Sequence, residues 1–413
     1  MSDVAEHRRA RPSPLAFHLG AAAAAYQSAI AGAAAAGRED FPWHPSLAPE
    51  AAELPETLDT LALCATANAR LGRFLSGLRK WQTHPYRRNV ESPPVIWQQG
   101  AARLLDYGQV PEANDPKGPV VLVVPSLINR AYILDLDKGN SLLRYLASRG
   151  LRPLLLDWGE PGDSEREFDF DDYATQRILP ALEIATKSGA DPAAVLGYCM
   201  GGTLSAGTLS MARADVRAFA CIGSPWDFSG YKGVAATLRG LAGNDPALAE
   251  KSLLSLGETF GLIPAELFQT LFAILDPLQA AVKFRKFDAM DMNSMEARCF
   301  VALEDWLAES VPMATGAAQN LLIDWNLDNT TARGDWFLKG ERVDLARLQA
   351  PAMAICGQND TIAPPQVACP LAAAMPDCRL LTPAAGHVGM IAGRRAPESV
   401  WAPLAEFLLH PNR

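Results

Sequence analysis

Apolar runs typical of buried β-strands alternate with helical patterns through the middle of the chain. The runs that indicate buried strands are Val120–Val124, Pro153–Leu156, Ala194–Leu196, Ala218–Ile222, Ala352–Cys356 and Arg379–Leu381. The helical patterns between the first four are Ser141–Arg149, Tyr173–Lys187 and Met200–Met211. Uninterrupted apolar strands separated by helices are typical of a parallel sheet that is covered on both faces. The pattern therefore predicts an α/β fold with a doubly wound, mostly parallel sheet.

The surrounding pattern divides the chain into four predicted parts. Residues 1–92 lack strand signals and predict an Ala-rich, helical N-terminal extension. Residues 93–234 form the first part of the α/β core and begin with a short pair of strands. Residues 235–345 are rich in Leu, Phe and Met at helical spacing and predict an inserted helical cap. Residues 346–413 return to the sheet pattern and end in an amphipathic helix.

The N-terminal extension contains a stretch without formal charge from Pro12 to Gly37, preceded by Arg8, Arg9 and Arg11. A signal peptide or a membrane span is more strongly apolar than this stretch, which is mainly Ala and Gly with little Leu or Ile. The favoured interpretation is a mobile Ala-rich helix, for which an apolar surface is one option as a binding place.

Composition and charge exclude several classes of function. Among 413 residues, 49% are apolar and 20% are charged, which is an ordinary globular composition. The net charge of −9 argues against a general nucleic-acid binder, which needs a basic surface. The seven cysteines lack the spacing of metal ligands, so we expect a reducing compartment and no metal site.

One cysteine has the surroundings of a nucleophile. Cys199 lies in the sequence Gly-Tyr-Cys-Met-Gly-Gly at residues 197–202, between a predicted strand and a predicted helix. This is the context of the nucleophile elbow of α/β hydrolases, with Cys in place of Ser. The glycines allow a strained turn in which larger side chains would meet neighbouring backbone, and the helix dipole favours a thiolate.

The histidine and the acid follow in the order that this fold uses. His387 is the only histidine between residues 85 and 409, and it lies in a loop of small residues after a late strand. Asp360 directly follows the strand run Ala352–Cys356, with Asp157 as a weaker alternative. The sequence therefore predicts a catalytic triad of Cys199, Asp360 and His387.

An oxyanion hole is expected from two backbone N–H groups. One belongs to Met200, the residue after the nucleophile, and the other to the loop after the first core strand. Ile128 is the favoured donor in that loop, with Leu127 as the alternative, because a side chain does not determine a backbone role.

Taken together, these motifs resemble the polyhydroxyalkanoate (poly-beta-hydroxybutyrate) synthase family of the α/β-hydrolase superfamily. The resemblance covers roughly residues 93–410 and is strongest to the catalytic subunit of the two-component synthases. The segments that carry it are Pro125–Leu136, Asp157–Pro161, Gly197–Thr203, Gly340–Leu345, Asn359–Asp360 and Gly386–Gly389.

The resemblance implies an acyltransferase that extends a polyester from (R)-3-hydroxyacyl-CoA through an acyl group on Cys199. His387 would deprotonate the thiol, the chain-end hydroxyl or both, and Asp360 would orient His387 or assist with the hydroxyl. CoA enters as part of the substrate, without a separate cofactor. The resemblance also implies a cytoplasmic location, with the granule surface as an alternative. Whether the chain forms a homodimer, needs a partner subunit or binds granule surface proteins stays open.

Other interpretations also stay open. A cysteine hydrolase, such as an intracellular polyester depolymerase or a thioesterase, would use the same triad with water as acceptor. A granule-associated protein without catalysis would keep only the fold. Within the predicted cap, Lys283, Arg285 and Lys286 form a basic cluster that is either a contact for the CoA phosphates or a solvated helix face.

Overall fold

The computed structural model describes residues 9, 12–35, 43–45, 49–50 and 59–412. The chain divides into two compact units. The helical unit comprises residues 1–87 and 269–308, and the sheet unit comprises residues 88–268 and 309–413. The predicted insert 235–345 is thus divided between the two units, because residues 269–308 group with the N-terminal residues.

The sheet unit is built on eight strands in the order β1-β2-β6-β3-β7-β8-β11-β12. Their bounds in chain order are β1 (Val95–Gln99), β2 (Ala102–Asp106), β3 (Val120–Val124), β6 (Arg152–Asp157), β7 (Ala194–Tyr198), β8 (Phe219–Ile222), β11 (Ala352–Ile355) and β12 (Cys378–Leu381). The pairs β1–β2 and β2–β6 are antiparallel, and all other neighbours are parallel. The predicted doubly wound, mostly parallel sheet is confirmed.

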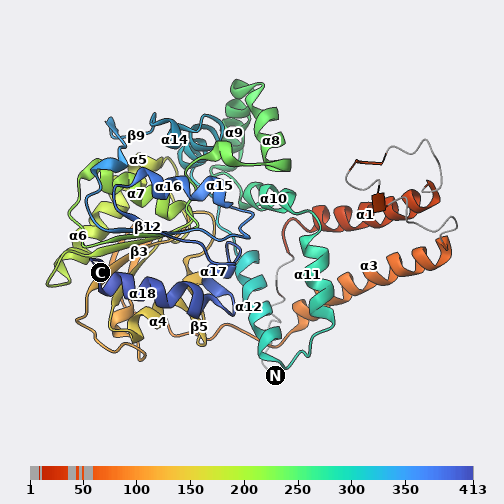
Figure 1. The fold of residues 1–413 in the computed structure, drawn as a ribbon, viewed down its shortest axis with the longest axis horizontal. Helices are drawn as coiled ribbons and strands as arrows, with labels where there is room; N and C mark the ends of the chain where they lie inside the picture. The colour runs from red at the N-terminus through yellow and green to blue at the C-terminus, as the bar shows by residue number, and fades with distance from the viewer. Residues whose placement is uncertain (1–8, 10–11, 36–42, 46–48, 51–58, 413) are drawn as a thin grey trace. The chain divides into compact units, whose positions relative to one another are not determined.

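The central strands are buried along their whole length. Every residue of β3, β7, β8 and β11 is buried, which explains why these segments are apolar without alternation. Helices α4 and α18 lie on one side of the strands and α7 on the other (Figure 1). The predicted strand runs agree with the observed strands to within two residues.

Helices and short strands connect the sheet. The helices of the sheet unit are α4 (Leu142–Ser148), α5 (Phe170–Tyr173), α6 (Leu179–Lys187), α7 (Met200–Ala212), α8 (Gly233–Gly243), α9 (Pro246–Phe260), α13 (Thr315–Gln319), α14 (Thr330–Arg333), α15 (Pro365–Ala368), α16 (Pro370–Ala374), α17 (Gly389–Ala392) and α18 (Ala402–Leu409). Three π-helical segments are η3 (Ala174–Ile178), η5 (Asn320–Leu327) and η7 (Pro397–Trp401). Short 3₁₀ turns are η1 (Tyr107–Gln109), η2 (Ala131–Leu134), η4 (Phe228–Gly230) and η6 (Leu345–Arg347). Two small strand pairs are β4 (Asp135–Asp137) with β5 (Asn140–Ser141) and β9 (Phe337–Leu338) with β10 (Glu341–Arg342).

The helical unit groups distant segments because two helices cross closely. Its helices are α1 (Leu15–Ala35), α3 (Thr60–Thr83), α11 (Gln279–Asp288) and α12 (Met295–Ala308), and α10 (Ala265–Leu275) leads into it from the sheet unit. A Cβ on Gly77 of α3 would lie 2.0 Å from the carbonyl oxygen of Phe284, so glycine permits the close approach of α11. Phe284 also packs against Phe74 and Trp81 of α3, with ring centroids 6.3 and 5.9 Å apart. These contacts draw residues 269–308 to the N-terminal helices.

The Ala-rich stretch forms α1, which packs against α3 within the helical unit. Ala22 of α1 is fully buried. Among the described residues, no helix is both long and apolar enough to cross a membrane. Arg8 and Arg11, which precede the stretch, lie outside the described residues.

Candidate active site

Cys199 lies at the sharp turn between β7 and α7. Its backbone has φ 56° and ψ −134°, a conformation that non-glycine residues rarely adopt and that stores strain. The turn is held because the Cys199 N–H donates to the carbonyl oxygen of Ile222 at 2.9 Å, and the Gly202 N–H donates to the carbonyl oxygen of Cys199 at 3.0 Å. A Cβ on Gly197 would lie 2.2 Å from the Cα of Gly202. The elbow geometry expected from the sequence is present.

His387 and Asp360 form a buried hydrogen-bonded pair. The Nδ1 of His387 lies 2.7 Å from the Oδ2 of Asp360, and the two residues are 7% and 3% exposed. The other carboxylate oxygen, Oδ1, accepts the backbone N–H groups of Ile362 and Ala363, both at 2.8 Å. Because a carboxylate only accepts, Nδ1 carries the proton, which leaves Nε2 for another partner.

Cys199 completes this arrangement. Burial lowers the pKa of His387, but the charges of Cys199 and Asp360 and the hydrogen bonds to both raise it to about 10. The imidazole therefore interacts with Cys199 as well as with the carboxylate of Asp360. The three residues predicted as a triad, which lie on three different loops, are brought together.

The alternative acid, Asp157, has a different role. Its Oδ2 accepts a hydrogen bond from Arg103 at 2.7 Å, and its Oδ1 accepts the N–H of Gly159 at 3.2 Å. The first contact ties β2 to β6, and the second fixes the turn after β6. Asp157 is therefore a structural residue in this structure, and Asp360 is the carboxylate beside His387.

The expected oxyanion donors lie on two adjacent elements. Met200 begins α7 directly after the nucleophile. A Cβ on Gly201 would lie 2.2 Å from the carbonyl oxygen of Pro125, so α7 packs tightly against the loop that follows β3. In that loop the N–H of Ile128 donates a hydrogen bond to the Oγ of Ser126 at 3.3 Å. This hydrogen bond would have to break before the N–H could donate to an oxyanion. The roles of Met200 and Ile128 stay predictions.

Three residues that sequence reasoning did not find also shape the site. Gly223 has φ 58°, and a Cβ there would lie 3.0 Å from the His387 ring. The ring of Tyr198 packs on His387 with centroids 5.2 Å apart. The hydroxyl of Tyr231 donates to the carbonyl oxygen of Ile362 at 2.8 Å, which supports the loop that carries Asp360. Only a glycine after a strand could have drawn attention to Gly223. Tyr198 belongs to the motif at residues 197–202, but the motif does not indicate a contact with His387, and no pattern marks Tyr231.

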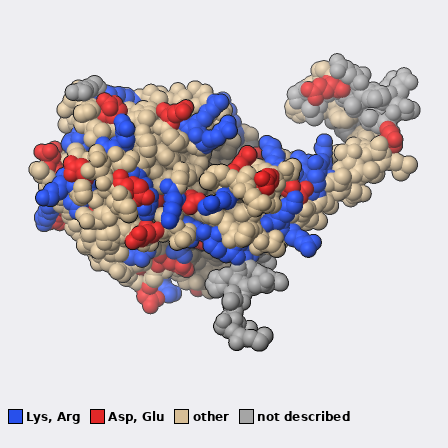
Figure 2. All heavy atoms as spheres, turned by 90° about the horizontal axis from the view of Figure 1, so that it is seen from below, with Lys and Arg blue, Asp and Glu red and all other residues tan. Residues whose placement is uncertain are grey.

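The basic cluster does not form one free surface. The Nζ of Lys283 lies 2.8 Å from the Oε1 of Glu304, which is buried, and Arg285 donates to the hydroxyl of Tyr26 at 3.2 Å. Lys286 is exposed. All three basic residues belong to the helical unit, whereas the triad belongs to the sheet unit. The face in Figure 2 carries acidic and basic side chains side by side.

Within the part of the chain that the structure describes, no group of three or more His, Cys, Asp and Glu side chains could hold a metal ion.

The fold and this site define the class of protein. Residues 119–393 match the family model described as "alpha/beta hydrolase fold", and the chain belongs to that family. Residues 89–146 match a second model, described as the N-terminus of poly-beta-hydroxybutyrate polymerase.

The curated relatives of this chain include poly(3-hydroxyalkanoate) polymerase subunits. The chain is 30% identical over 318 residues to the poly(3-hydroxyalkanoate) polymerase subunit PhaC of Haloferax mediterranei, covering 76% of this chain and 63% of that protein. The subunit of the same name from Haloarcula marismortui is 28% identical, with 76% and 66% covered. The one from Synechocystis sp. is 26% identical, with 81% and 90% covered. This chain therefore matches less than two thirds of the length of the first two relatives. The resemblance to the polyhydroxyalkanoate synthases is confirmed.

Proposed function

We propose that this chain is an acyltransferase that polymerises (R)-3-hydroxyacyl-CoA into polyhydroxyalkanoate through a covalent acyl group on Cys199. The observation that carries the proposal is the buried bond between His387 and Asp360 beside a cysteine at a nucleophile elbow. The names of the similar proteins supply the substrate class, because the same triad also serves hydrolysis.

In the first half of the proposed cycle the acyl group moves from CoA to the enzyme. His387 takes the proton of the Cys199 thiol, and the thiolate attacks the thioester carbonyl carbon. The N–H of Met200 and one N–H of the loop after β3 stabilise the oxyanion. The carbon–sulfur bond to CoA breaks, and the CoA sulfur leaves with the proton that His387 held. One thioester has replaced another, so the type of bond is conserved.

In the second half of the proposed cycle the acyl group moves from Cys199 to a hydroxyl group. A hydrolase would use water as the acceptor at this step. The hydroxyl of another hydroxyacyl group gives its proton to His387 and attacks the acyl carbon on Cys199. An ester bond forms, the carbon–sulfur bond to Cys199 breaks, and the polyester is longer by one unit. Asp360 holds the imidazole through Nδ1 during both proton transfers.

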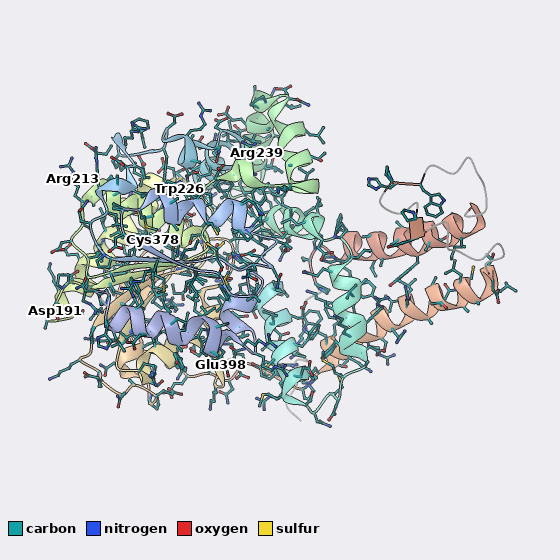
Figure 3. The ribbon with its side chains drawn as sticks, viewed as in Figure 1. Asp191, Arg213, Trp226, Arg239, Cys378 and Glu398 are labelled. Atoms are coloured by element: carbon teal, nitrogen blue, oxygen red, sulfur yellow. The ribbon has the colours of Figure 1, made fainter. Side chains whose placement is uncertain are left out.

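The experiment is to incubate the full chain with 3-hydroxybutyryl-CoA and to measure free CoA and insoluble polymer. We expect both products from the natural chain and neither from Cys199→Ala. Cys378→Ala is the matched control, because Cys378 lies on the edge strand β12 (Figure 3) and burial raises the pKa of its thiol to about 11. This control should keep full activity.

Each other outcome has a definite meaning. Release of CoA together with free hydroxy acid and no polymer would replace the proposal with a thioesterase or hydrolase. Covalent labelling of Cys199→Ala by radioactive substrate would show that another residue is the nucleophile. If polymer forms, its association with the chain in cell fractions tests the expected cytoplasmic or granule-surface location. The mass of the active species decides between a single chain, a homodimer and a complex with a partner subunit.

A further inference from the structure

An arginine from the N-terminal segment is buried at the C-terminal end of α3 within the helical unit. The Nε of Arg9 lies 2.6 Å from the Oδ1 of Asp305, a residue 296 positions away in the sequence. One terminal nitrogen of the guanidinium donates to the carbonyl oxygens of Trp81 at 3.1 Å and His84 at 2.5 Å. The other terminal nitrogen donates to the carbonyl oxygen of Tyr86. The Arg9 side chain is only 6% exposed.

The acceptors around Arg9 form a cradle that suits a guanidinium group. The carbonyl oxygen of Trp81 belongs to the last turn of α3, at the negative end of the helix dipole, and it also accepts the N–H of His84 at 3.2 Å. The carbonyl oxygens of His84 and Tyr86 belong to the turn that follows α3. Asp305 adds a full negative charge next to them. A guanidinium presents several N–H donors in one plane, so a single group serves a carboxylate and three carbonyl oxygens at once. A lysine ammonium has a different geometry and fewer donors.

The cradle is held in place by bonds that do not involve Arg9. The indole N–H of Trp81 donates to the Oδ1 of Asp305 at 2.9 Å and fixes this carboxylate. The Nδ1 of His84 accepts the N–H of Tyr86 at 3.1 Å, and its Nε2 lies 2.9 Å from the carbonyl oxygen of Met292. These bonds fix the turn that follows α3. The acceptors therefore stay arranged when the arginine is removed.

We propose that this cradle, formed by Asp305 and the carbonyl oxygens of Trp81, His84 and Tyr86, is a guanidinium-binding site that Arg9 occupies as a built-in ligand. The site holds Arg9 against the C-terminal end of α3 and against Asp305 of α12, within the helical unit. It is independent of Cys199 and of the proposed polymerisation. A matched comparison is Arg87, which also donates to the carbonyl oxygens of His84 and Tyr86, at 2.9 and 2.7 Å, but is exposed.

The test measures thermal unfolding of the full chain and of single variants. Arg9→Ala should lower the melting temperature by about 1–4 °C, because it removes the cation that lies 2.6 Å from the partly buried carboxylate of Asp305. Arg9→Lys keeps the charge but loses the planar donors. Its melting temperature should therefore lie between those of the natural chain and of Arg9→Ala. Arg87→Ala should change the melting temperature less than Arg9→Ala.

Chemical rescue then identifies the ligand class. Millimolar ethylguanidinium should raise the melting temperature of Arg9→Ala in a saturable way, and ethylammonium should not. The natural chain should not respond, because Arg9 fills the site, and neither should the double variant Arg9→Ala, Asp305→Asn. An unchanged melting temperature in Arg9→Ala, or equal rescue by ethylammonium, would overturn the proposal. If Arg9→Ala does not fold, the same rescue is measured on Arg9→Lys.

Discussion

The close approach of the nucleophile helix to the loop after β3 makes Gly201 a sensitive test of the site. A Cβ at this position would lie 2.2 Å from the carbonyl oxygen of Pro125 and 2.4 Å from that of Val124. Both neighbours are backbone atoms, so no side chain can rotate away. The Pro125 oxygen also accepts the indole N–H of Trp158 at 3.0 Å, which ties the same loop to the segment that directly follows β6. A methyl group at residue 201 must therefore push α7 away from the loop.

The size of the effect follows from these distances. Ordinary van der Waals contact begins at 3.4 Å, and 3.4 − 2.2 = 1.2 Å, so the helix and the loop must separate by that amount. Overpacking of a well-packed core usually costs about 1–3 kcal/mol, and a rigid backbone neighbour places Gly201→Ala at the upper end. Misplacing reacting groups by about 1 Å lowers the rate about 100-fold. Because the predicted oxyanion donors lie on the two elements that separate, we expect activity to fall by at least that factor.

The assay compares Gly201→Ala with Gly240→Ala, which lies in α8 with no heavy atom within 4 Å of its added Cβ. Replacing an open helical glycine with alanine stabilises a helix by up to about 1 kcal/mol. Urea unfolding should show loss of stability in Gly201→Ala and a small gain in Gly240→Ala, and only the former should lose CoA release. If Gly201→Ala were as stable and as active as the natural chain, the packing of this elbow would differ from the one described.

Three further predictions concern charged groups in the sheet unit. Asp360→Asn should keep the fold but lower CoA release about 10³- to 10⁴-fold, because it disturbs the orientation and protonation of His387; an activity loss below tenfold would contradict this role. The pKa of His387 is raised from 6.5 to about 10, so the stability it contributes is complete below pH 6.5 and is lost as the pH rises through 10. Melting temperatures should fall more steeply across that window in the natural chain than in Cys199→Ala, and equal slopes would refute the coupling. Arg177→Leu removes the cation that lies 2.6 Å from the Oε1 of buried Glu165 and should cost about 3–5 kcal/mol in urea unfolding, whereas a loss near zero would show that Glu165 finds another partner.

Most of the sheet could be predicted because its physical signals are local. Strands such as Val120–Val124 are buried on both faces, so all of their consecutive residues are apolar and can be recognised in the sequence. The meeting of Asp360 and His387 could be predicted from chain order, since the carboxyl ends of parallel strands lie at one edge of a sheet. The elbow combined both kinds of signal, a strand and a helix around Cys199.

The division into units could not be predicted, because it depends on which surfaces meet. The amphipathic pattern of α11 fits an inserted cap as well as it fits a partner for α3. The deciding feature is the close approach of Gly77 to the backbone of Phe284, which no local pattern encodes. The support of His387 by Gly223 and Tyr198 was missed for the same reason, and so was the pairing of Lys283 with Glu304.

The electrostatics of the site have a consequence for the order of events in the proposed cycle. The charge of Cys199 is one of the causes that raise the pKa of His387, together with Asp360. The imidazole takes its proton from the thiol, holds it while the thiolate attacks the thioester carbonyl, and gives it to the departing CoA sulfur. Acylation converts the sulfur into a neutral thioester, which removes that charge and lowers the pKa of His387. The same imidazole then becomes a base for the incoming hydroxyl only after the acyl group is attached. On this reasoning, acylation of Cys199 makes His387 a better base for the acceptor. Whether the acceptor is a polyester chain or a water molecule then depends on the exclusion of water from the site.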